Sequence, residues 1–93
     1  MIIGTVEIKI YAAWVESLKE KRMIVKSLIA KTRNKFNVSI AEIAEQDTHQ
    51  TIVLGIACVT SSVSQADSII DHVMTLIESS TEAEIVQIDR EMR

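Results

Sequence analysis

The 93-residue sequence has no proline, one cysteine and two isolated glycines, and each scarcity excludes a class of protein or site. The lone thiol of Cys58 cannot form an intrachain disulfide or a cysteine-based metal site, so we expect a reducing compartment. Gly4 and Gly55 stand too far apart to build a glycine-rich phosphate loop. With 47% hydrophobic and 25% charged residues and a net charge of −3, the composition is that of an ordinary globular protein, which excludes disordered and collagen-like chains.

Long hydrophobic runs are also missing. No stretch approaches the roughly 18 uncharged apolar residues that a membrane-spanning helix needs. The residues from Met1 to Ile10 contain neither a basic segment nor a long apolar one, so we expect no signal peptide. The chain length suits one domain over residues 1–93. We therefore predict a cytoplasmic protein with no membrane partner.

The first third of the sequence predicts a strand followed by a helix. Residues 2–11 alternate between apolar and polar types, which is the period of a half-buried strand. Ser17 stands three residues before Glu20, the spacing at which a serine hydroxyl and a glutamate carboxylate cap the start of a helix. A helix over residues 18–35 is expected, with its apolar positions on one side of the wheel: Leu18, Val25, Leu28, Ile29 and Phe36.

The middle of the sequence predicts a hairpin. Residues 37–46 indicate an edge strand with a bulge, because the apolar parity changes between Ile40 and Ile43. The polar residues 46–50 then lead into the almost continuous apolar run 52–59. Such a run is typical of a strand that is covered on both faces.

The last third predicts a second helix and a final strand. Residues 66, 69, 70, 73 and 77 are apolar at the three-four spacing of one buried stripe. Residues 85–88 indicate a strand, which is expected to precede a charged tail over residues 89–93. Either of two serine pairs can cap the second helix, namely Ser62 with Gln65 or Ser64 with Asp67.

The order of the elements is therefore βαββαβ. Two crossover units joined by a hairpin are accommodated most simply by the split βαβ arrangement. We predict an α+β, ferredoxin-like sandwich whose four-stranded antiparallel sheet has the order 4-1-3-2, with both helices on one face. This topology gathers polar residues from distant parts of the chain on one rim of the sheet: Trp14, Ser17, Lys19, Lys21, Arg22, Gln46, Asp47 and His49.

The first helix is strongly basic in an acidic protein. It carries seven of the ten lysines and arginines, and Glu20 is its only acid. Lys19, Arg22, Lys26 and Arg33 fall within about 60° of one another on the helical wheel, and we call these four residues the basic stripe. One interpretation is a solvated helix face, and the other is a contact surface for the phosphates of a polyanion, aided by the positive helix N-terminus.

Two residues near that helix each allow two interpretations. Lys21 falls within the apolar arc, so it either extends over the sheet rim or pairs with a carboxylate such as Asp47, and we favour the salt bridge. As a cation of the first helix it is also a candidate for anion binding. Trp14 either packs beneath the first helix or anchors a partner.

The predicted sheet face without helices lacks aromatic side chains on its central strands. Its expected outward residues are polar on the first strand and small or apolar on the third, so we do not expect bases to stack on this sheet. Val53, Ala57 and Val59 are nevertheless apolar, and such a row is not expected to face water. A homodimer through this face is our prediction, with a monomer that tolerates the patch as the alternative.

No motif predicts catalysis, a metal site or a cofactor. His49 and His72 lack the neighbours that a closed metal site requires, and we interpret both as surface residues. The serines at positions 61, 62 and 64 are explained by helix capping, because no histidine is placed to activate one. Cys58 is interpreted as a buried, inert thiol. Lys21, Asp47 and His49 have groups suited to acid–base chemistry, but no spacing demands it.

The pattern from strand to hairpin resembles the YlxP-like family of small bacterial proteins. The resemblance rests on the run from Ser17 to Arg22, on Phe36 to Ser39, and on Ala41-Glu42 with Gln46-Asp47. It implies a ferredoxin-like fold and no established catalytic residues. It also implies a genetic setting among transcription elongation, translation initiation and ribosome maturation factors.

Together these features favour a non-enzymatic accessory factor in ribosome maturation or translation. We expect it to contact ribosomal RNA or a ribosomal subunit through the basic stripe, without DNA specificity. The alternative hypothesis is a homodimeric module for protein interaction or small-ligand regulation, with a pocket at the rim or the dimer seam.

Overall fold

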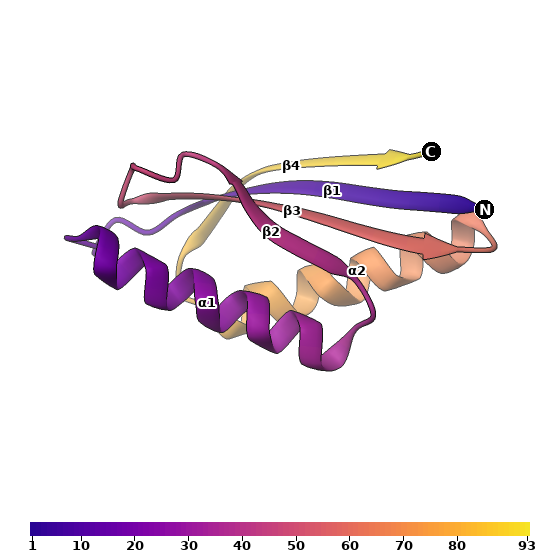
Figure 1. The fold of residues 1–93 in the computed structure, drawn as a ribbon, viewed down its shortest axis with the longest axis horizontal. Coiled ribbons are helices and arrows are strands. Elements are labelled where there is room, and N and C mark those ends of the chain that lie inside the picture. Colours follow the sequence, from indigo (N-terminus) through magenta and orange to yellow (C-terminus); the bar gives the residue numbers. More distant parts are fainter.

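Alternating apolar residues at the N-terminus form one of the two central strands of the computed structural model, which describes residues 1–93 (Figure 1). A four-stranded sheet lies above two helices, and both helices cover the same face. The elements in chain order are β1 (Ile2–Tyr11), α1 (Leu18–Lys35), β2 (Ser39–Ala44), β3 (Thr51–Thr60), α2 (Val63–Ser80) and β4 (Glu84–Met92). The expected βαββαβ order is therefore confirmed.

The sheet is antiparallel throughout. Counted from the β2 edge, the strand order is β2-β3-β1-β4, and the order 4-1-3-2 written above lists the same neighbours from the opposite edge. The register of β2 on β3 shifts between Glu42 and Ala44, so the expected bulge is present at Ile43. A second shift, at Val86 of β4, was not predicted.

The core fills the space between the sheet and the helices. Alternate residues of β1 and β3 point to the helices and are buried, among them Ile8 and Leu54. α2 packs so closely on β1 that a Cβ atom at Gly4 would lie 3.0 Å from the Cβ of Ala66. Cys58 is 2% exposed in this core, as expected of an inert thiol.

Serine caps set the first residue of each helix. The Ser17 hydroxyl accepts from the backbone N–H of Glu20 at 3.1 Å, and the Ser62 hydroxyl accepts from that of Gln65 at 3.2 Å. Of the two pairs considered for α2, the cap is thus Ser62 with Gln65. No helix of the structure combines the length and the apolar character that a membrane crossing requires.

Two sequence-based expectations are wrong. β3 is not covered on both faces, because Val53, Gly55 and Ala57 are only half-buried on the side away from the helices, and Val59 is 66% exposed. We call that side the outer face. Residues 89–92 do not form a tail but continue β4, because they pair with residues 4–7 of β1. Backbone hydrogen bonding outweighs the polar character of this segment.

Candidate functional site

Lys21 is the most deeply buried charge of the molecule, with 1% exposure. Its ammonium nitrogen Nζ donates to the carbonyl oxygens of Glu45 at 2.5 Å and Thr48 at 2.7 Å. Nζ also lies 2.8 Å from Oε2 of Glu42, which is itself buried and has no other partner. The three N–H donors of the ammonium are matched by three oxygens. The predicted salt bridge is therefore present, but its carboxylate belongs to Glu42 and not to Asp47.

These contacts fix the loop between β2 and β3 to the first turn of α1. The loop contains Glu45, whose φ of 57° is unusual for a residue other than glycine. The backbone N–H of Thr48 donates to the Glu45 carbonyl, and the Thr48 hydroxyl donates to the Glu45 carboxylate at 3.0 Å. The loop thus closes around the ammonium. Lys21 has no donor left for a ligand, which corrects its place among the anion-binding candidates.

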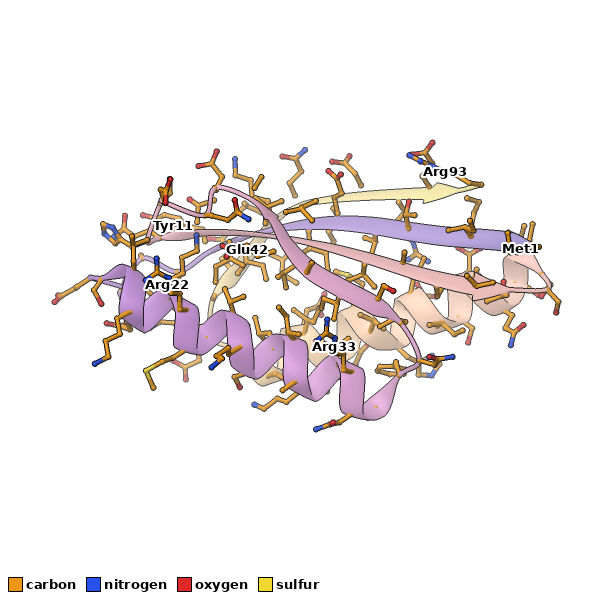
Figure 2. The ribbon with its side chains drawn as sticks, in the orientation of Figure 1. Met1, Tyr11, Arg22, Arg33, Glu42 and Arg93 are labelled. Atoms are coloured by element: carbon orange, nitrogen blue, oxygen red, sulfur yellow. The ribbon has the colours of Figure 1, made fainter.

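The basic stripe remains available on the surface. Lys19, Arg22, Lys26 and Arg33 are all exposed, and none has a carboxylate within 4.0 Å, since the ion pairs of the chain involve only Lys21, Arg90 and Arg93. Figure 2 shows Arg22 and Arg33 on the side of α1 that faces β2. Arg33 Nη2 donates to the carbonyl of Ile40 at 3.2 Å, which places the stripe beside the edge of the sheet.

The other rim candidates lie at the start of α1 and in the two loops beside it. Ser17 is occupied as a helix cap, while Asp47 and His49 are exposed residues of the loop between β2 and β3. Trp14 lies in the loop before α1 and is 48% exposed. It borders a groove of about 270 Å³ with residues of α1 and with Ser80 and Thr81 at the end of α2. Trp14 therefore borders the helices, and the hydrogen bonds of Gln50 with Ala12 and Ala13 hold its loop beside the loop that carries His49.

The outer face divides into an apolar half and an acidic half. Val53, Ala57 and Val59, the candidates for a dimer contact, belong to β3, and Ile43 of the β2 bulge lies over Gly55 at 3.0 Å from where a Cβ would stand. A shallow trough of about 900 Å³ runs over this half toward β4. Its far side carries three carboxylates, Glu7, Asp89 and Glu91.

Only one of those three carboxylates forms an ion pair. Glu7 of β1 stands directly opposite Asp89 of β4, and neither forms an ion pair. Glu91 accepts from Arg93 Nη2 at 2.9 Å, and this hydrogen bond holds the pKa of Glu91 below its ordinary value. The acidic half thus carries more negative charge than its few cations neutralise.

The sequence analysis missed the role of Arg90. Its guanidinium donates to Asp71 at 2.6 Å and to Asp67 at 3.1 Å, which joins β4 to α2, and the hydrogen bond to Asp71 is the largest cause of its raised pKa. The i, i+4 spacing of the two aspartates was a usable signal, but the arginine lies about twenty residues away in sequence. No group of three or more histidine, cysteine or carboxylate side chains is placed to hold a metal ion.

Comparison with known proteins identifies the family. The family model described as "Protein of unknown function (DUF503)" matches residues 3–90. The chain belongs to this family. The "Uncharacterized protein YlxP" of Bacillus subtilis (strain 168) is 47% identical over 68 residues, which cover 73% of this chain and 74% of that protein. The YlxP-like resemblance is therefore confirmed.

Solved structures bear out the fold of this DUF503 chain. A de novo designed protein with a ferredoxin fold superposes with a TM-score of 0.62 at 24% identity, covering 100% of this chain and 86% of the designed one. A structural-genomics protein, YjcS, gives a TM-score of 0.61 at 12% identity and covers 96% of each chain. At these identities the likeness shows the ferredoxin-like architecture alone.

Proposed function

We propose that this protein is a non-enzymatic, cytoplasmic accessory factor that contacts RNA, on its own or in the ribosome, through the basic stripe of α1. The observation that carries the proposal is the absence of acidic partners for the stripe. A solvated helix face in a folded protein commonly balances its cations with nearby carboxylates. Here none of the four cations has a carboxylate within 4.0 Å, although Glu20 lies in the same helix and Arg33 borders the trough that reaches the acidic half.

The distribution of charge favours an anionic strand on α1. Four exposed cations follow one side of an 18-residue helix, and the positive end of the helix dipole adds to them at Ser17. Phosphates bound there would release counterions, so binding would weaken steeply with salt. The acidic half of the outer face repels phosphate. RNA is therefore directed to the helix layer and away from the sheet, whose central strands carry one aromatic residue, Tyr11 at the end of β1.

Charge reversal of the stripe tests this function. The variant with Lys19, Arg22 and Lys26 all changed to Glu is expected to lose RNA binding at low salt. If each of these contacts reaches one phosphate, the slope of log K against log salt should flatten by about 2 for single strands. Fluorescence anisotropy with labelled ribosomal RNA fragments, and cosedimentation with purified ribosomal subunits, would measure both effects.

A matched variant distinguishes the effect of the stripe's position from the effect of the protein's net charge on RNA binding. Changing Lys9, Lys31 and Lys35 to Glu alters the net charge by the same amount, but these lysines are exposed at other positions. This control should bind more tightly than the stripe variant at every salt concentration. Equal losses in the two variants, or unchanged binding in the stripe variant, would reject the stripe as the contact surface.

A second proposal, a homodimer through the outer face, has its own supporting observation. Val59 is 66% and Ile43 is 45% exposed on a sheet face that no helix covers. A two-fold axis parallel to the strands and centred on β2 and β3 would stack the two apolar halves. The acidic halves would then overhang on opposite sides, in water. The second copy would roof the part of the trough that lies over the apolar half, which provides the seam that a small ligand could occupy.

A substitution in the apolar half of the outer face tests the dimer proposal. Val59→Asp should convert the dimer to a monomer at tens of micromolar, because it places a carboxylate in the stacked apolar halves. Val63→Asp is the matched control, since Val63 is 48% exposed in the first turn of α2, where an acid suits the helix dipole. Analytical ultracentrifugation would distinguish them. If the parent protein is strictly monomeric, the dimer proposal is wrong, and so is the ligand site at the dimer seam.

A further inference from the structure

The groove beside Trp14 is lined by apolar and hydroxyl side chains and lies at the margin of the basic stripe. Trp14 is 48% and Met23 is 66% exposed, and both are large hydrophobic side chains. The groove measures about 270 Å³. Its remaining walls come from α1 and from the end of α2: Ile24, Ser27, Leu28, Ser80 and Thr81.

We propose that this groove receives one unpaired base of a single-stranded RNA, stacked against Trp14, while the neighbouring phosphates lie on the basic stripe. This inference rests on the RNA contact proposed above and specifies its ligand. It makes Trp14 the residue that selects single strands, and it leaves to the stripe the sequence-independent attraction to phosphate.

Helix geometry places the groove next to the cations. Met23 follows Lys19 by four residues and precedes Lys26 by three, so its side chain is a surface neighbour of both. On the wheel Met23 lies about 40° to 60° from these lysines, on the side away from β2. A strand whose phosphates follow the stripe therefore passes the mouth of the groove. An aromatic wall beside a cationic track is the combination that binds single strands without sequence preference.

The chemistry of the groove suits a base better than a phosphate. α2 ends at Ser80 with no basic residue in its last turn, so no cationic side chain balances the partial negative charge of its carbonyl end. That charge disfavours phosphate and favours the amino groups of bases. Ser27 and Thr81 contribute hydroxyl groups that can donate to or accept from a base edge.

Duplex RNA cannot make this contact. Its bases are stacked and paired inside the helix, and the edges in its deep groove are beyond the reach of side chains. A duplex can therefore use the stripe alone. The groove consequently predicts a preference for single strands that depends on Trp14 and is independent of the lysines.

The single tryptophan of the chain provides the test. A fluorescein-labelled RNA decamer of mixed sequence would be titrated as a single strand and as a duplex at low salt. Anisotropy reports binding, and the emission of Trp14 reports contact with the groove. We expect the single strand to quench Trp14 with the midpoint seen by anisotropy, whereas the duplex binds without comparable quenching.

Three variants complete the experiment. Trp14→Leu should weaken single-strand binding by about tenfold or more and leave duplex binding within twofold, because one stacked base is lost. Trp14→Phe should retain most of the single-strand affinity, since an aromatic face remains. Tyr11→Leu is the control, because Tyr11 is also exposed but lies on β1 at the sheet.

The outcomes separate this inference from the function on which it rests. Single-strand binding that needs the stripe but neither quenches Trp14 nor weakens in Trp14→Leu would overturn the groove and leave the RNA-contact function standing. Equal losses for single strand and duplex in Trp14→Leu would also overturn it, since the residue would then act on the fold. If neither RNA binds the parent protein, both proposals fail.

Discussion

Replacement of Lys21 by alanine is expected to lower the free energy of unfolding by about 3 kcal/mol, which corresponds to about 12 to 24 °C in Tm for a domain of this size. The change leaves the buried Oε2 of Glu42 without its partner and removes the donor from two loop carbonyls. A carboxylate that loses its partner in a dry environment costs 3 to 5 kcal/mol, roughly. The Glu42 side chain is 17% exposed, so water relieves part of that cost and favours the lower value.

Urea denaturation of matched variants would measure this effect. Lys26→Ala removes an exposed lysine from the same helix and should change stability by less than about 0.5 kcal/mol. Glu42→Gln retains an acceptor for the ammonium but removes the opposite charge. Its loss of unfolding free energy should therefore fall between the losses of Lys21→Ala and Lys26→Ala. A Lys21→Ala variant as stable as Lys26→Ala would show that the loop does not depend on the ammonium.

The second large effect is expected at Gly4, where α2 crosses β1. Gly4→Ala would place a methyl group 3.0 Å from the Cβ of Ala66, 3.1 Å from Cδ1 of Ile70 and 3.2 Å from Sγ of Cys58. All three neighbours are buried, so the helix must move to make room. Overpacking of this kind destabilises a protein by about 1 to 3 kcal/mol, whereas the reduced conformational freedom of the unfolded chain stabilises it by roughly 0.4 to 1 kcal/mol. We expect a net loss of about 1 to 2 kcal/mol.

Gly55→Ala is the matched control for this prediction. Its new methyl group would also lie 3.0 Å from a neighbour, but that neighbour is the side chain of Ile43, which is 45% exposed and can rotate into solvent. The substitution should be neutral or slightly stabilising by chemical denaturation. If the two alanine variants lost equal stability, the effect would belong to glycine in strands generally and not to the packing of α2 on β1.

The burial of Lys21 changes the functional hypothesis as well as the stability. In sequence it is one of seven cations of the first helix, and charge alone cannot separate it from the stripe. The structure gives it a structural task, to hold the loop between β2 and β3 against α1. The surface proposed for RNA is thereby reduced to four cations, and its neighbour becomes the Trp14 groove.

The fold was largely determined by local patterns. Strict alternation in residues 2–11 and the serine caps of both helices fix the period and the start of each element, and these signals involve residues only a few positions apart. The bulge at Ile43 was visible as a change of parity for the same reason. The family resemblance, carried by short runs of residues, was likewise accessible in the sequence.

Contacts between distant residues were decided only by the tertiary structure. The choice of Glu42 over Asp47 as the partner of Lys21 depends on which carboxylate the β2 strand presents beneath the loop, and the burial of that pair depends on how α1 meets the sheet. The pairing of Arg90 with α2, and the strand character of residues 89–92, require β4 to be seated beside β1. The sequence by itself determined the helices, the strands and the basic stripe, because their periodicity is local. Only the tertiary structure decided which charged side chains form internal ion pairs and which stay exposed for a ligand, because those contacts join residues that are distant in sequence.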